Sequence, residues 1–121
     1  MLLTLAAASP TPAATSDVDR EVAHLIQFVQ QSGCRFYRNG SWYPGEKAGQ
    51  HMRLKFDYLE QRGQITSAED FITKAASRSS MSGEEYRVRC GNGADTPAGV
   101  WLKNELAHYR ALLPATVPAG P

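Results

Sequence analysis

Two short stretches decide the fold: Cys34-Arg-Phe-Tyr-Arg38 and Glu85-Tyr-Arg-Val-Arg-Cys90. In both, every second residue is apolar or cysteine over most of the stretch, which is typical of a β-strand with one buried face. If the strands are antiparallel with Cys34 opposite Cys90, then Phe36 faces Val88 and Arg38 faces Tyr86. One register therefore brings both cysteines and the apolar residues onto the same face.

This register predicts a disulfide between Cys34 and Cys90. Directly opposed strand residues have α-carbons closer than the roughly 7 Å that a disulfide allows. The bond implies an oxidising compartment, and the alternative is two free buried thiols in a cytosolic protein. The chain has 2 cysteines, which cannot complete a four-thiolate zinc site. We expect no metal site and no cofactor.

Apolar residues that recur every three or four positions predict four helices around the two strands. The first expected helix follows Ser16 and ends at Gly33, and the second runs over about 46–61. The third opens at the capping box Thr66-Ser-Ala-Glu69. The fourth has Thr96 as its cap and Pro97 as its first residue, and Pro114 ends it. Asn39-Gly40 and Tyr43-Pro44-Gly45 predict turns. The expected fold class is α+β: four helices packed with a short two-stranded antiparallel ribbon.

The 121 residues are expected to form one domain over 16–113. Residues 1–15 begin with small apolar side chains and continue with serine, proline and alanine, as the end of a secretory signal does. No lysine or arginine precedes Arg20, so a disordered leader is the alternative. The tail 114–121 is rich in proline and alanine, which predicts disorder.

The charge balance argues against a nucleic-acid partner. Lysine and arginine number 13 against 12 acidic residues, for a net charge of +1. Arg35, Arg87 and Arg89 would share the outer face of the ribbon, where we expect solvent rather than nucleic acid. No apolar run reaches the ~18 residues of a transmembrane helix, so we expect no transmembrane segment.

One group of polar residues is a candidate binding site. His51 and Lys55 lie one turn apart on the second helix, and Arg38 ends the inward strand face. The flanking turns contribute Asn39, Tyr43, Ser80 and Ser82. Arginine and lysine suit a carboxylate, phosphate or sugar-acid group. The alternative is structural: Arg38 and His51 would satisfy backbone carbonyls of the serine-rich loop 77–83.

Catalysis is a third interpretation of the same residues. His51 could act as a general base, with Ser80 or Ser82 as the nucleophile. The sequence has no G-x-S-x-G elbow around either serine. We therefore assign no catalytic residue.

Three motifs in this order carry a family resemblance. They are Phe36-Tyr-Arg-Asn-Gly40, the spacing A-x-x-H-x-x-x-K from Ala48 to Lys55, and S-S-x-S-G-x-x-Y from Ser79 to Tyr86. Together they resemble the YfeK-like family of small bacterial periplasmic proteins of unknown function. The resemblance implies export to the periplasm and supplies no activity.

The function expected from the sequence is non-enzymatic binding by an exported protein. The partner would be an unknown envelope protein or a small anionic ligand, held around Arg38, His51 and Lys55. The alternative function is a small cell-envelope hydrolase that uses His51 as its general base.

Overall fold

The computed structural model describes residues 16–114. The expected leader 1–15, and the expected tail beyond its first residue, lie outside the described residues. The elements follow one another as α1 (Asp17–Gln31), β1 (Arg35–Arg38), β2 (Ser41–Pro44), α2 (Gly45–Gln61), α3 (Ala68–Ala75), β3 (Arg87–Arg89), β4 (Thr96–Pro97) and α4 (Ala98–Leu112).

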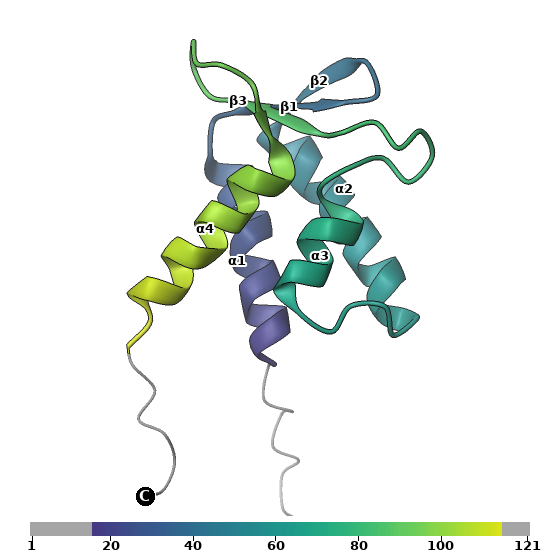
Figure 1. The fold of residues 1–121 in the computed structure, drawn as a ribbon, viewed down its shortest axis with the longest axis vertical. Helices are drawn as coiled ribbons and strands as arrows, with labels where there is room; N and C mark the ends of the chain where they lie inside the picture. The colour runs from purple at the N-terminus through teal and green to yellow at the C-terminus, as the bar shows by residue number, and fades with distance from the viewer. Residues whose placement is uncertain (1–15, 115–121) are drawn as a thin grey trace, which may run out of the picture.

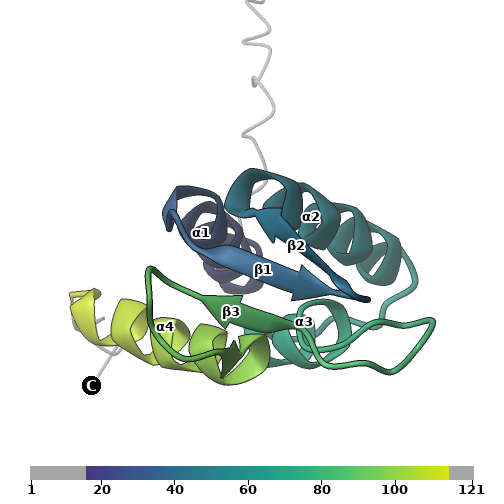
Figure 2. The ribbon, with the colours of Figure 1, turned by 90° about the horizontal axis from the view of Figure 1, so that it is seen from above.

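The sheet covers one end of a layer of helices (Figure 1). Its strand order is β2-β1-β3-β4, and all the pairs are antiparallel. Seen from above, β1 and β2 lie on the side of α1 and α2, and β3 lies on the side of α4 and α3 (Figure 2). The α+β class and the four helices are confirmed.

The core lies between the sheet and the apolar stripes of the helices. Its fully buried side chains include Leu25 of α1, Phe71 and Ile72 of α3, and Leu102 of α4. Phe36 and Val88 close the core from the sheet. The α1–α2 contact depends on glycine, because a Cβ at Gly45 would collide with the backbone carbonyl of Val29.

The predicted register between the two main strands is confirmed. Phe36 pairs with Val88, and Arg35 pairs with Arg89. The prediction of a two-stranded ribbon is wrong, because β2 and β4 extend the sheet to four strands. Asn39 and Gly40 both have positive φ, 47° and 89°. They form a two-residue hairpin turn, after which the chain returns directly as β2. This strand occupies part of the segment 43–45, where a second turn was expected.

Several expected helix starts are shifted. Thr96-Pro97 was expected as the cap and first residue of the last helix, but it pairs with β3 as β4, an edge position that tolerates proline. Ser67, rather than Thr66, caps α3, since its hydroxyl accepts from the Asp70 N–H at 3.0 Å.

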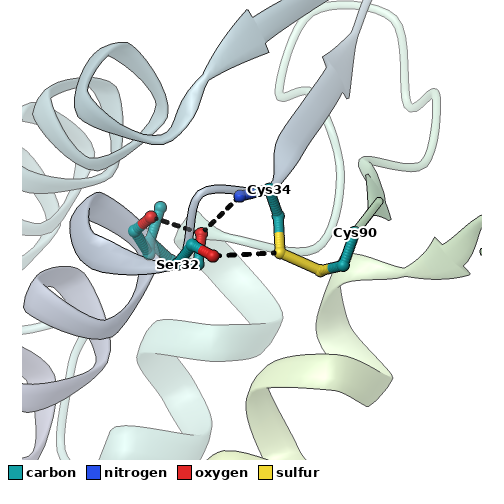
Figure 3. Close-up of a disulfide and its surroundings, with 4 residues drawn as sticks. Ser32, Cys34 and Cys90 are labelled. Atoms are coloured by element: carbon teal, nitrogen blue, oxygen red, sulfur yellow. Dashed lines mark hydrogen bonds between the residues drawn. A yellow bond between two sulfur atoms is a disulfide. The ribbon is translucent and has the colours of Figure 1, made fainter. Parts of the chain in front are cut away.

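A disulfide joins Cys34 and Cys90 just outside the paired residues of β1 and β3 (Figure 3), with a Cα–Cα distance of 4.4 Å. The Cys34 N–H donates to the Ser32 hydroxyl at 3.1 Å, and that hydroxyl donates to the Val29 carbonyl at 2.8 Å. The disulfide is thereby tied to the end of α1. Within residues 16–114, no helix has the length and apolar character needed to cross a membrane.

Candidate functional site

Three of the predicted site residues meet where β1 ends above α2. The Arg38 Nη1 lies 2.7 Å from His51 Nδ1 and 2.9 Å from His51 Nε2. One helical turn further along α2, Lys55 Nζ donates to the Tyr86 hydroxyl at 3.3 Å and to the Arg78 carbonyl at 3.2 Å. Tyr86 comes just before β3 and is buried. Strand alternation and helical spacing therefore bring Arg38, His51 and Lys55 together, with Tyr86 between them.

Most polar atoms of this cluster are hydrogen-bond donors. Both nitrogens of the neutral His51 ring lie near Arg38 Nη1, and the one without a proton accepts from it. His51 Nε2 also lies 3.4 Å from the Tyr86 oxygen. Arg38 Nε is buried without a hydrogen-bond partner. Arg38 Nη2 makes no hydrogen bond among residues 16–114, so the guanidinium keeps unused donors.

The positive charge of the cluster is not balanced by a carboxylate. Among residues 16–114, no ion pair includes Arg38 or Lys55. Burial, then Arg38 and Lys55, lower the pKa of His51 to about 4, so the ring is neutral at pH 7. Burial and the Arg38 charge also lower the pKa of Lys55. Burial raises the pKa of Tyr86, which Arg38 partly opposes.

Two clefts open on either side of the contact between Arg38 and His51. The first measures about 300 Å³ and is lined by Phe36, Tyr37, Arg38, Tyr43, Lys47, Ala48, Gln50, His51, Met52, Leu54 and Tyr86. The second measures about 310 Å³ and is lined by Arg38, Asn39, His51, Lys55, Ser79, Ser80, Met81 and Tyr86. Arg38, His51 and Tyr86 line both of these clefts, whereas Lys55 lines the second cleft and not the first.

Asn39 and Ser82 meet each other at the rim instead of joining the cationic cluster. Asn39 Nδ2 donates to the Ser79 hydroxyl at 3.1 Å, and the Ser82 hydroxyl donates to Asn39 Oδ1 at 2.7 Å. Ser79 is buried, and its oxygen also accepts from the backbone N–H groups of Met81 and Ser82, each at 3.3 Å. These bonds hold the serine-rich loop against the hairpin. Ser80 lines the second cleft.

Two residues of the site were missing from the sequence prediction. Tyr86 could have been included, because the register already placed it opposite Arg38. Ser79 could not be separated from Ser80 and Ser82, because a run of serines has no pattern that marks the buried one. Tyr43, which was predicted, lies with its ring 5.4 Å from the Arg38 guanidinium carbon.

The expected acceptors for Arg38 were wrong. The structural alternative assigned the carbonyls of the serine-rich loop to Arg38, but neither these carbonyls nor the carboxylates of α3 bind it, and its hydrogen-bond partner among residues 16–114 is His51. Lys55 takes the loop carbonyl, whereas Glu69 binds Arg110 and Asp70 binds Thr66.

On the outer face of the sheet, Arg87 and Arg89 are paired with carboxylates. Arg89 Nε lies 2.6 Å from Asp95 Oδ1, and Arg87 Nη1 lies 2.8 Å from Glu85 Oε1. Arg89 also lies over the Trp42 ring, 4.4 Å from its centroid. These pairs make the outer face unlike the cluster around Arg38.

Fold and site together define a small α+β domain with a disulfide-linked sheet and a half-buried cationic cluster. The chain belongs to DUF5329, a family of unknown function, whose profile matches residues 16–110. It is similar to the uncharacterised protein YfeK of Salmonella typhimurium (strain LT2), with 41% identity over 64 residues. That match covers 53% of this chain and 52% of YfeK, about half of the relative's length. No solved structure matches the chain.

Proposed function

We propose that this protein binds a small anionic ligand between Arg38 and Lys55 and leaves it chemically unchanged. The observation that carries the proposal is a pair of half-buried cations with no carboxylate in an ion pair with either. Like charges held close together out of water destabilise the folded state. A bound carboxylate or phosphate would relieve that repulsion.

The donors around the clefts suit such a ligand. The planar Arg38 guanidinium can offer Nη2 to an anion while Nη1 stays on His51. The Tyr86 oxygen already accepts from Lys55, so its own proton is available to an acceptor in the cleft. His51 is neutral at pH 7 and positions Arg38 through its ring nitrogen.

Hydrolysis has less support than binding. A neutral His51 would suit a general base, but its ring nitrogens face Arg38 and Tyr86. The Ser82 hydroxyl donates to Asn39, and the Ser79 hydroxyl accepts from the same side chain. Within residues 16–114, His51 has no hydrogen bond to a serine or a carboxylate. Binding without catalysis is therefore the function we propose.

Titration calorimetry with sulfate tests the proposal. Arg38→Met and Lys55→Met keep the apolar stem and remove the charge, so each should weaken sulfate binding by about 10- to 100-fold, the scale of a hydrogen bond to a charged group. The matched control is Arg53→Met, on the same helix outside both clefts, which should bind as the wild type does. Arg38→Met should unfold at the same temperature as the wild type or higher, since it removes a repulsion.

The pH profile belongs to the same experiment. Sulfate stays ionised between pH 7 and pH 4, whereas His51 gains a proton as the pH falls toward its pKa of about 4. Sulfate binding should therefore strengthen as the pH falls, and less so in His51→Gln. Wild-type protein that does not bind sulfate, or an Arg38→Met variant that binds it equally well, would contradict the proposal. A lower melting temperature with unchanged binding would instead assign Arg38 a structural role.

We also propose that the protein works in the bacterial periplasm. The Cys34–Cys90 disulfide supports this, because such bonds persist in oxidising compartments. Thiol labelling of denatured, non-reduced protein from its native cells should find no reactive thiol. Two reactive thiols per chain would contradict the proposed compartment.

A further inference from the structure

We infer that the ligand is an amphiphilic anion, with its charged group at Arg38 and its apolar chain or ring in the first cleft. This inference rests on the proposed anion site and adds the class of molecule that the site would select. It starts from the first cleft, where Arg38 meets a mostly apolar lining.

The first cleft is mostly apolar. Its apolar wall comes from β1, β2 and α2 and consists of Phe36, Tyr43, Ala48, Met52 and Leu54. Arg38 and His51 close one part of it, and Lys47 and Gln50 add polar groups from α2. An apolar cleft with a few convergent polar groups is the usual form of a small-molecule site, and about 300 Å³ is the lower end of that range.

The exposure of Leu54 also supports placing the apolar chain of the ligand in the first cleft. Its side chain is 68% exposed although it lines the first cleft. It lies on α2 between His51 and Lys55 in sequence, next to the cationic cluster. An apolar chain extending from an anion at Arg38 would cover Leu54 and remove its surface from water.

The second cleft differs from the first by the polar groups that it adds to Arg38 and His51. Its lining contains the polar side chains of Asn39, Ser79 and Ser80 along with Lys55. An inorganic anion could be satisfied on that side alone. The apolar first cleft would then have no role, so a series of ligands with growing chains separates the two cases.

The test compares acetate, butanoate, hexanoate and octanoate in calorimetric titrations of the wild-type protein. Affinity should rise by about two- to fourfold for each added methylene, as expected for partial to full burial of a CH₂ group. Octyl phosphate tests the other anionic head, and octylamine should not bind because its head is positive. A preference between octanoate and octyl phosphate identifies the head group.

Two variants test where the apolar chain of the ligand lies. Leu54→Ser changes an exposed side chain and should reduce the gain per methylene while sulfate binding stays at the wild-type level. Ala48→Phe fills the cleft and should reduce the gain further. Val100→Ser on α4, whose side chain is also exposed, is the matched control and should leave both affinities unchanged.

The outcomes separate this inference from the proposed anion site. Sulfate binding without any effect of chain length would overturn the inference that the ligand is amphiphilic and would support the proposed anion site. If neither sulfate nor octanoate binds, both the proposed anion site and the inferred amphiphilic ligand are refuted. A chain-length effect that Leu54→Ser and Ala48→Phe leave intact would place the chain elsewhere and overturn the inference.

Discussion

Replacing Cys34 and Cys90 together by alanine is expected to lower the free energy of unfolding by about 4 kcal/mol. The disulfide spans 56 positions in sequence, and in the chain-entropy model a loop of that length restricts the unfolded chain by about this amount. Domains of this size are stable by only about 5–15 kcal/mol. We therefore expect a fall in the melting temperature on the order of 20 °C.

Urea unfolding of three samples checks this expectation. The oxidised wild type should be the most stable, and the reduced wild type should match the double alanine variant. A single Ser32→Ala variant is the local control, because it removes the hydroxyl that binds the Cys34 N–H and keeps the disulfide. It should lose only about 1 kcal/mol. A double variant as stable as the oxidised wild type would refute the stabilising role of the bond.

The main strand register could be predicted because several signals agree. A β-strand repeats every two residues, so aligning the cysteines also aligned Phe36 with Val88. The helices were predictable for a similar reason, since their apolar stripes extend over several turns. β2 and β4 were missed because Pro44 resembles part of a turn and Thr96-Pro97 resembles a helix start. They exist because β1 and β3 offer them backbone partners.

The part of the candidate site that lies on helices and strands could be predicted from the sequence. The spacing of His51 and Lys55 and the inward face of Arg38 follow from regular structure alone. The roles of the serines do not, because the loop around Ser79 has no repeating pattern. Its shape depends on a long-range hydrogen bond from Asn39, which the sequence pattern does not show.

Asn39→Ala is expected to lower the free energy of unfolding by about 2–4 kcal/mol. Asn39 has a φ of 47°, a conformation that costs alanine about 1 kcal/mol or more. The change also removes the hydrogen bonds to the Ser79 and Ser82 hydroxyls, each worth about 1 kcal/mol. Chemical denaturation measures the sum.

Asn39→Gly separates the two contributions. Glycine adopts positive φ without strain, so it should lose the side-chain bonds alone and remain more stable than Asn39→Ala by about 1 kcal/mol. Equal stability of the two variants would mean that the positive φ is not strained for alanine, and a wild-type-like Asn39→Ala would refute the whole assignment.

Both variants should also loosen the loop that forms one wall of the second cleft. The Gly83 N–H bonds to the Ser79 carbonyl, and the Ser79 N–H bonds to the Glu84 carbonyl. Hydrogen exchange at these amides should become faster in Asn39→Gly, while the amides of β1 and β3 stay protected. Because the Arg78 carbonyl holds Lys55 from the same loop, sulfate affinity should fall severalfold although Arg38 and His51 are unchanged. Faster exchange with full sulfate affinity would mean that Lys55 binds the anion without help from the loop.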